Sequence, residues 1–363
     1  MKAGAVFPAQ RRVEIVDLKE PELTSATQVK LRILEVGVCG TDREICRFHH
    51  GTVPQGDEFL VLGHESLAEV VETGSAVSRL RRGDLVVPSV RLPCRSVECE
   101  ACRVEESDFC SSGKFVERGI KQAHGFMTDF VVDDQAWLHS VPLEIRDVAI
   151  LVEPLTIAEK TLAEIQAIQR RLPFRKRSPR AVVLGAGPIG LLGAMALVNA
   201  GYETYIYSRE LAPNTRADVA AQIGATYISS QSQTIPALVE MVGNIDVVYE
   251  AIGAAQTAFD LLEVLGANGL FCFTGVPRHG QPISVHTSRL LHNMVLKNQA
   301  VVGAVNAGRE AFQAAVRDLG TFYRRWPGAV KSLITGRYAL NDFREPILQP
   351  SGIKNLIVLG GTN

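Results

Sequence analysis

The sequence lacks both a strong net charge and a long apolar run. Its 38 Lys and Arg residues nearly balance its 39 Asp and Glu residues, giving a formal net charge of -1 at pH 7, so electrostatics favours neither nucleic acid nor acidic lipid as a partner. No stretch approaches the roughly 18 apolar residues that cross a bilayer, and residues 1–10 hold no apolar core of signal-peptide length. We therefore expect a cytoplasmic protein with no membrane and no nucleic-acid partner.

Internal repeats and low-complexity tracts are also missing, so ordinary globular domains must account for the 363 residues. At roughly 150 residues per domain, this length suggests about two domains. The 46% hydrophobic and 21% charged fractions agree with that class. Residues 170–180 (RRLPFRKRSPR) are basic, contain two prolines and have no periodic apolar face, which predicts a solvated connection.

The pattern of apolar residues changes near this connection. Before it, short apolar runs such as Val29–Val38 are broken by Gly, Pro and Asp, which predicts short strands in a mostly antiparallel domain. After it, strands and helices alternate from residue 181 onward, which predicts parallel strands with right-handed crossovers in a doubly wound sheet. We place this second domain at 178–305 and the first at 1–177, completed by a tail, 306–363, that packs back on it.

A glycine-rich turn opens the second domain. Residues 181–190 read AVVLGAGPIG, an apolar strand that runs directly into the turn and then a helix, which is the context expected of a dinucleotide site. Gly185 allows the tight turn, Gly187 lets the backbone approach a pyrophosphate, and Gly190 lets helix and strand pack closely. The alternative is a turn that binds nothing. The residues expected to form the cradle are Gly185, Ala186, Gly187, Pro188, Ile189 and Gly190.

The choice between the two nicotinamide cofactors should be made at the end of the next strand. No Asp or Glu stands at its last position, whereas Ser208 and Arg209 can hydrogen-bond and charge-pair a 2′-phosphate. NADP is therefore expected. Use of NAD stays open because Glu210 follows directly, and Arg209 could instead be a solvated loop charge.

Two kinds of metal ligand stand near the N-terminus, Cys39 in GVCGTD (37–42) and His64 in GHE (63–65). A catalytic zinc needs three protein ligands and an open fourth position, and thiolate and imidazole both suit it. Glu153 in LVEPL is the candidate third ligand, and Pro154 after it indicates a strand-to-helix corner facing an interdomain cleft. Each residue alone would more often be a packing or hydrogen-bonding residue.

Four of the seven cysteines form a second candidate site. Cys94, Cys99, Cys102 and Cys110 follow the spacing C-x4-C-x2-C-x7-C within a polar loop, which in a reducing compartment predicts a closed tetrahedral zinc site. Such a loop has little apolar content, so metal binding would supply its ordering free energy.

Taken together and in order, GVCGTD, GHE, the cysteine cluster, LVEPL and VLGAGPIG resemble the zinc-containing medium-chain alcohol and polyol dehydrogenases over essentially the whole chain. FVERGI (115–120), HGFMTDF (124–130) and VVGAVNAG (301–308) are similar to the glucose 1-dehydrogenases. The resemblance implies a GroES-like catalytic domain, a Rossmann cofactor domain and a homodimer or homotetramer. The first two cysteines of the cluster, however, are separated by four residues where relatives usually have two.

The resemblance also implies a reaction, in which zinc held by Cys39, His64 and Glu153 stabilises the alkoxide from which hydride leaves. Thr41 would relay the proton, and Glu65 would join either the metal or the substrate. The residues expected to contact the sugar are Thr41, Glu65, Glu117, Glu153 and Asn306. The further residues expected near the cofactor are Thr274, Val305 and Asn306.

Three functions stay open on the sequence alone. The favoured one oxidises C1 of glucose or another aldose with NAD(P), and the runner-up oxidises a polyol or secondary alcohol with the same zinc. Two residues weaken the favoured function: Val90 is apolar where sugar-specific relatives often carry Asn, and Ile157 is apolar where some carry Asp. A different or less hydroxylated substrate therefore stays open. The third is a non-catalytic zinc protein that binds NADPH, which the intact set of metal and relay residues argues against.

Overall fold

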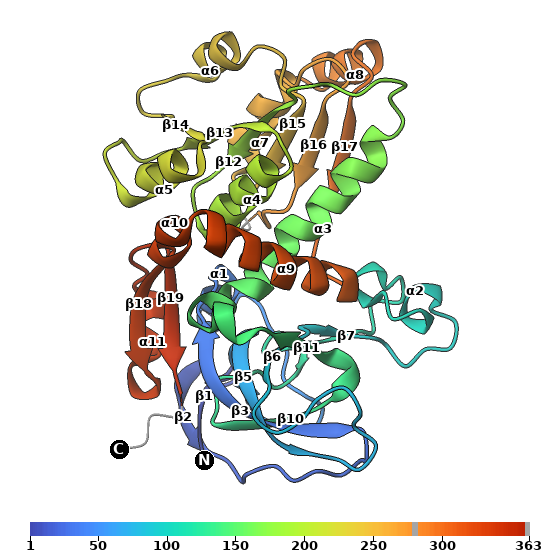
Figure 1. Ribbon diagram of the computed structural model, residues 1–363, viewed down its shortest axis with the longest axis vertical. Coiled ribbons are helices and arrows are strands. Elements are labelled where there is room, and N and C mark those ends of the chain that lie inside the picture. Colours follow the sequence, from blue (N-terminus) through green and yellow to red (C-terminus); the bar gives the residue numbers. More distant parts are fainter. Residues whose placement is uncertain (278–281, 360–363) are drawn as a thin grey trace. The chain divides into compact units, whose positions relative to one another are not determined.

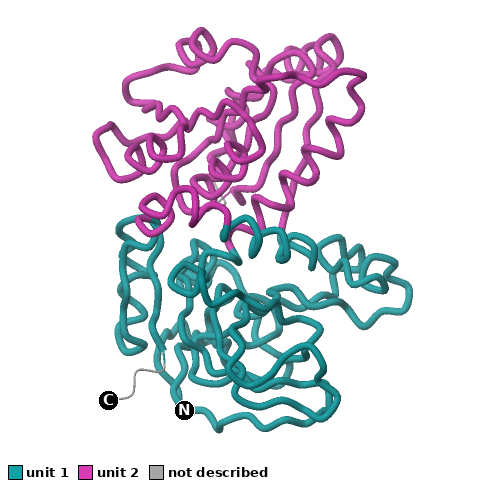
Figure 2. Tube along the Cα trace, in the orientation of Figure 1, with its two compact units in different colours: residues 1–153, 306–320, 333–363 teal, residues 154–305, 321–332 magenta. Residues whose placement is uncertain are grey.

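The computed structural model describes residues 1–277 and 282–359 and divides into two compact units, coloured separately in Figure 2. Unit 1 is Met1–Glu153, Asn306–Gly320 and Leu333–Asn363, and unit 2 is Pro154–Val305 and Thr321–Ser332. The first division falls after residue 153, whereas the sequence suggested 177. The reason is helix α3 (Val152–Gln169), which runs almost wholly within unit 2 and whose Lys160 donates to the carbonyl oxygen of Val305 at 3.0 Å.

Three sheets build unit 1, and most of their pairs are antiparallel, as expected (Figure 1). The largest has the order β11-β6-β5-β3-β19-β18, with β10 also on β3, and the smaller ones are β2-β1-β4 and β7-β8-β9. The strands are β1 (Lys2–Phe7), β2 (Arg12–Asp17), β3 (Gln28–Gly37), β4 (Leu60–Val61), β5 (Glu65–Thr73), β6 (Leu85–Pro88), β7 (Arg91–Leu92), β8 (Val116–Arg118), β9 (Gln122–Ala123), β10 (Phe130–Asp134), β11 (Leu138–Val141), β18 (Ile334–Ala339) and β19 (Lys354–Val358).

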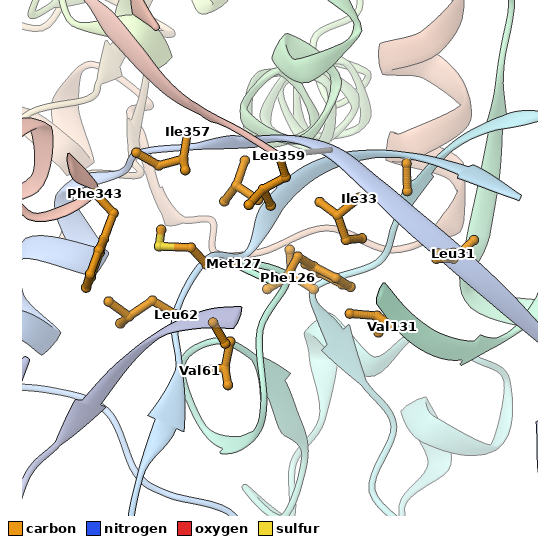
Figure 3. Close-up of a cluster of buried hydrophobic side chains, with 14 of the residues drawn as sticks. Leu31, Ile33, Val61, Leu62, Phe126, Met127, Val131, Phe343, Ile357 and Leu359 are labelled. Atoms are coloured by element: carbon orange, nitrogen blue, oxygen red, sulfur yellow. The ribbon is translucent and has the colours of Figure 1, made fainter. Parts of the chain in front are cut away.

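The core of unit 1 lies against strand β3. Burial alternates along this strand, so that Val29, Leu31 and Ile33 are fully buried, as the two-residue period of a strand requires. Figure 3 shows Ile33 in the same cluster as Phe126 and other side chains from distant segments. Each fully buried apolar side chain stabilises the fold by about 1.5–3 kcal/mol, so this cluster fixes the strands that carry the site.

The C-terminal tail joins the largest sheet of unit 1 through its last strands, whereas Thr321–Ser332, which was expected to pack with the rest of the tail, belongs to unit 2. Strand β19 pairs antiparallel with β3, with Ile357 opposite Val36. The helices of unit 1 are short: α1 (Gly40–Cys46), α2 (Glu100–Arg103), α11 (Arg344–Leu348) and the 3-10 helices η1 (Ser107–Phe109), η2 (Gln135–Trp137), η3 (Leu143–Leu151) and η4 (Leu340–Asp342). Helix α9 (Arg309–Arg325) begins in unit 1 and ends in unit 2.

Unit 2 is a doubly wound parallel sheet with the order β14-β13-β12-β15-β16-β17, which confirms the predicted fold class. Strand order reverses beside β12, and ligands of such sheets bind outside the carboxyl ends of the strands at that point. No helix among the described residues is both long and apolar enough to span a bilayer. The elements are β12 (Arg180–Leu184), α4 (Pro188–Asn199), β13 (Glu203–Ser208), α5 (Thr215–Ile223), β14 (Thr226–Ser229), α6 (Ile235–Val242), β15 (Val247–Glu250), α7 (Ala255–Glu263), β16 (Leu270–Phe273), α8 (Thr287–Leu296), β17 (Ala300–Gly303) and α10 (Pro327–Ser332).

Candidate functional site

Three side chains with metal-binding atoms meet in unit 1. The ligand atoms of Cys39, His64 and Glu65 all lie within 4.8 Å of one another. Cys39 caps the N-terminus of α1, while His64 and Glu65 stand where β5 begins beside the end of β3. The pairing of β3 with β5 therefore brings together residues from two separate motifs of the sequence.

Asp42 supports two members of this cluster, although no role was predicted for it. One carboxylate oxygen accepts from the backbone N–H of Cys39 at 2.8 Å, and the other lies 3.4 Å from Nδ1 of His64. Burial alone lowers the pKa of an imidazole, but the Asp42 carboxylate outweighs it and raises the pKa of His64 well above its ordinary value. A carboxylate behind a ligating histidine fixes the orientation of the ring. The three-residue spacing from Cys39 was the signal that could have identified Asp42.

Glu153, the third ligand expected from the sequence, is not in the group of ligand atoms within 4.8 Å of one another, but its carboxyl group interacts electrostatically with Glu65 and His64. Its carboxyl group is buried, and burial together with the neighbouring Glu65 carboxylate raises the pKa of Glu153 to about 8. The expected strand-to-helix corner was wrong in one respect. The residue stands in the first turn of α3, and the 3-10 helix η3 precedes it where a strand was expected.

The composition of the cluster fits a divalent cation. Three acidic groups, the carboxyl groups of Glu65 and Glu153 and the thiol of Cys39, act on the ammonium group of the buried Lys354. Buried negative charge is stable only when it is paired or coordinates a metal. A thiolate, an imidazole and a carboxylate are also the donors that zinc prefers in catalytic sites.

Thr41 stands on the first turn of α1, next to this cluster. Its hydroxyl oxygen lies 3.8 Å from the sulfur of Cys39. The side chain is half-buried, so the hydroxyl can exchange a proton with a bound group and with solvent.

The four clustered cysteines converge despite their unusual spacing. Cys94, Cys99, Cys102 and Cys110 place their sulfur atoms within 4.8 Å of one another, and those of Cys99 and Cys110 are 3.8 Å apart. The backbone N–H of Cys102 lowers the pKa of Cys99 to about 5. A preformed group of four sulfur atoms, one of them poised as a thiolate, fits tetrahedral zinc.

Two of the expected sugar contacts also meet in unit 1. The side-chain amide of Asn306 donates to Oε1 of Glu117 at 2.9 Å, although 189 positions separate the two residues. Asn306 has a left-handed backbone (φ 57°) stabilised by its own side chain, which accepts from the N–H of Ala307. Arg91, for which no role was predicted, donates to the same oxygen of Glu117.

In unit 2 the glycine-rich turn has the predicted geometry. Gly185 has φ +107°, and a Cβ on Gly190 would stand 2.1 Å from the carbonyl oxygen of Gly185. Gly187 caps the N-terminus of α4, and a Cβ there would meet nothing within 4 Å. Open space over free helical N–H groups suits a pyrophosphate. Ala186, Pro188 and Ile189 complete the turn and the first residues of the helix.

The end of β13 carries the residues expected to select the cofactor. The strand ends at Ser208, and the carbonyl oxygen of Arg209 accepts from the hydroxyl of Ser229 at 3.0 Å. Glu210 is paired with Arg216 at 2.6 Å, and Nε of Arg216 donates to the carbonyl oxygen of Ala186 in the glycine-rich turn. Arg216 therefore links both parts of the expected cofactor site and was missed because it lies on the following helix.

The two remaining cofactor residues are placed by backbone contacts in unit 2. Thr274 follows β16, and its hydroxyl donates to the carbonyl oxygen of Glu250 at 2.7 Å. Val305 follows β17 and accepts from Lys160 through its own carbonyl oxygen. Both stand beyond the carboxyl ends of parallel strands, where doubly wound sheets bind their ligands.

Comparison with known proteins places these features in a family. The model for an alcohol dehydrogenase GroES-like domain matches residues 25–143, and that for a glucose dehydrogenase C-terminus matches residues 146–357. Glucose 1-dehydrogenase of Methanocella arvoryzae is 36% identical over 362 residues, covering 99% of this chain and all of the relative. That of Thermoproteus tenax is 36% identical over 348 residues, covering 95% of each chain.

Solved structures agree with these matches. Haloferax mediterranei glucose dehydrogenase in complex with NADP, Zn and gluconolactone is similar with a TM-score of 0.89 and 33% identity over the whole of both chains. The fold is thus that of the medium-chain dehydrogenases. Within them, the chain belongs to the zinc-containing glucose dehydrogenase family.

Proposed function

We propose that this protein is a zinc-dependent glucose 1-dehydrogenase, which oxidises C1 of glucose or a related aldose to the lactone and reduces NADP. The observation that carries the proposal is the convergence of Cys39, His64 and Glu65 in a buried cluster. The relatives named above support the same substrate class, and one of them was solved with NADP, Zn and gluconolactone. Hydride leaves C1 for the cofactor, and the hydroxyl proton is released.

Each part of the site has a task in this reaction. Cys39, His64 and Glu153 would hold the catalytic zinc, with Glu65 as a further ligand or substrate contact; when bound, zinc supplies a Lewis acid for the alkoxide. Thr41 accepts the hydroxyl proton and passes it toward solvent. Glu117 and Asn306 orient the sugar by hydrogen bonds, because each buried hydroxyl left unpaired costs about 1–3 kcal/mol.

The preference for NADP follows from the charges after β13. Arg209 and Ser208 offer a cation and a donor to a 2′-phosphate, and Arg216 compensates the carboxylate of Glu210 that would otherwise repel it. Gly185, Gly187 and Gly190 take the pyrophosphate, and Thr274 and Val305 border the bound cofactor. In an Arg209→Met variant, the ratio of kcat/KM for NADP to that for NAD should fall about tenfold or more. An unchanged ratio would show that Arg209 is a solvated charge.

The second zinc is assigned to Cys94, Cys99, Cys102 and Cys110, where it would be structural. Four free thiols in one cluster also favour the cytoplasm, whose reducing conditions keep thiols available for metal.

A homodimer or homotetramer is proposed from one edge of the unit 2 sheet. Strand β17 ends the strand order, with Val301 38% exposed, and on the neighbouring helix α8 Val295 and Leu296 are 73% and 68% exposed. A sheet edge beside exposed apolar side chains favours pairing with a second copy of the chain.

Oxidation of a polyol or secondary alcohol is the second candidate. Val90 is buried and Ile157 half-buried, and neither can bind a hydroxyl. The test is a panel of aldoses, alditols and simple alcohols with NADP or NAD, followed by cofactor absorbance and by metal analysis of the same sample. Preferred oxidation of aldoses supports the proposal, and faster oxidation of alditols supports the second candidate. A zinc-loaded sample that binds NADPH but oxidises nothing would indicate a non-catalytic protein.

A further inference from the structure

A buried arginine joins the segment of the four cysteines to one of the proposed sugar contacts. Nε of Arg91 donates to Oε1 of Glu117 at 3.0 Å, and Nη2 lies 3.0 Å from the same oxygen. Its third nitrogen, Nη1, donates to the carbonyl oxygen of Asp108 at 3.2 Å. The guanidinium plane also stacks on Phe115, 3.8 Å from the ring centre. Each of the three guanidinium nitrogens therefore has a partner, and an aromatic ring lies against the group.

The two oxygens of Glu117 are in different situations. Oε1 accepts from Arg91 and from the amide of Asn306 at 2.9 Å. Oε2 has no hydrogen-bond partner among the described residues, and it is not one of the unpartnered atoms that are closed off from solvent. An ionised carboxylate only accepts hydrogen bonds. Glu117 thus presents one open acceptor whose direction is set by the contacts on the other oxygen.

These contacts originate in the segment 94–110, which we call the cysteine lobe. Arg91 leads into the lobe, and its carbonyl oxygen accepts from the hydroxyl of Ser107 at 3.0 Å. Asp108, which holds Nη1 of Arg91, precedes Cys110 by two positions. The lobe also holds the start of α9, because Arg309 donates to Glu105 at 2.6 Å. Both Arg91 and the segment that begins with Asn306 are therefore anchored on the lobe.

We propose that Arg91 is a positioning residue that transmits the order of the cysteine lobe to Glu117, so that Oε2 accepts from one hydroxyl of a polyhydroxylated substrate. The inference rests on the proposed function for the nature of the substrate. It adds a specificity role to a lobe whose metal was expected to contribute stability alone. Without Arg91, the Glu117 carboxylate loses the two guanidinium contacts that orient it. A guanidinium donates from nitrogens held in one plane, which the single ammonium group of lysine cannot reproduce.

The test uses the full-length, zinc-loaded enzyme as Arg91→Met and Arg91→Lys variants, with Lys121→Met as the matched control. Lys121 stacks on the same ring, 4.0 Å from its centre, but its ammonium group donates to the carbonyl oxygen of Gly113 at 2.6 Å. For both Arg91 variants, KM for glucose should rise about 10- to 100-fold, the value of a hydrogen bond to a charged group. The KM for NADP, the zinc content and the values of the control should stay within about twofold of wild type.

A second measurement separates positioning from a general structural effect. Glucose analogues that each lack one hydroxyl are titrated calorimetrically into wild type and Arg91→Lys without turnover. In wild type, one analogue should bind about tenfold more weakly than the others. In the variant, that same analogue should bind no worse than glucose. The Glu117 carboxylate is already misplaced there, so removing the hydroxyl that it would bind costs nothing further.

Several results would contradict the proposed role of Arg91. An unchanged glucose KM in both variants, a fall in kcat alone, or equal losses for every analogue would overturn the role of Arg91. Loss of zinc from the variants with an unchanged KM would also overturn it, because the arginine would then be purely structural. If Arg91→Met does not fold, Arg91→Lys decides. If the wild-type enzyme itself neither binds nor oxidises any sugar, the proposed function fails together with this inference. If wild type oxidises glucose and only the results for the Arg91 variants differ from those expected, this inference alone fails.

Discussion

Lys354 is buried at the start of β19 and binds both carboxylate oxygens of Glu65, with Nζ 2.8 Å from one and 2.6 Å from the other. Its third contact is the carbonyl oxygen of Val38 at 3.2 Å. Burial lowers the pKa of a lysine, but the Glu65 carboxylate outweighs it and raises the pKa of Lys354. The C-terminal strand therefore supplies a cation that binds the Glu65 carboxylate, and a metal ion would have to compete with Lys354 for that carboxylate.

Replacing Lys354 by Met should lower the free energy of unfolding of the metal-free protein by about 3–5 kcal/mol, because it leaves the buried Glu65 carboxylate uncompensated. Zinc should restore more stability to the variant than to wild type, since Glu65 becomes available as a ligand. Urea denaturation with chelator and with zinc measures both effects. In the Glu65→Gln/Lys354→Met control, most of the loss should disappear, and a double variant as unstable as the single one would contradict the explanation.

A different kind of prediction concerns acid stability. His139 is buried, stacks on Phe312 with ring centres 4.3 Å apart and bonds to the hydroxyl of Ser89 at 2.9 Å. Burial, with help from the cations of Arg309 and Arg79, lowers the pKa of His139 to about 3. In the unfolded chain His139 therefore becomes protonated near pH 6.5, whereas in the folded chain it stays neutral down to about pH 3. The stability from the neutral ring is complete above pH 6.5 and falls between these values.

The slope of this loss should reach at most about 1.4 kcal/mol per pH unit. Unfolding free energies measured from pH 7 to pH 4 for wild type and His139→Gln give the comparison. The variant should be less stable at pH 7 but should lose less stability on acidification. Parallel curves for the two proteins would show that His139 does not titrate in this way.

Local patterns were enough to predict much of the molecule. The turn at Gly185–Gly190 and the four-cysteine segment are coded within a few neighbouring residues, because backbone geometry and thiol chemistry act over short distances. The ends of α5 are also set locally, because Asn214 caps the first turn and Gly224 (φ 80°) ends the last one. The convergence of Cys39 and His64 was also expected, since each stands in a short motif; their role as zinc ligands stays a prediction.

The rest depends on contacts between distant segments. Lys354 and Glu65 are 289 positions apart, and a lysine in a short strand gives no sign that it will be buried. The same holds for the contact between Asn306 and Glu117, which requires the fold before the two can meet. A helix was expected after Pro154, but the extent of α3 was not predicted, because its apolar residues are spread around it and its pattern does not show one buried face.

The cysteine cluster makes a prediction about metal content. Cys99→Ser should reduce zinc from about two atoms per chain to about one, since a structural site needs all four thiolates. The variant should also unfold at lower temperature, because metal binding contributes directly to the folding of such a loop. Cys46→Ser is the matched control, because this cysteine is buried outside both clusters. Two zinc atoms retained in Cys99→Ser would refute the assignment.

The exposed face of α8 gives a prediction about assembly. Leu291 and Val295 are 63% and 73% exposed and one helical turn apart, so a double change to Glu places two like charges on the surface proposed to meet a second copy. Light scattering after size-exclusion chromatography should show wild type as a dimer or tetramer and the double variant as a smaller species. Leu143→Glu, at a residue that is 75% exposed in unit 1, should leave the mass unchanged. If the wild-type protein is a monomer, or if the double variant keeps the wild-type mass, this face of α8 is not the interface, because charge repulsion across a desolvated contact would have separated the copies.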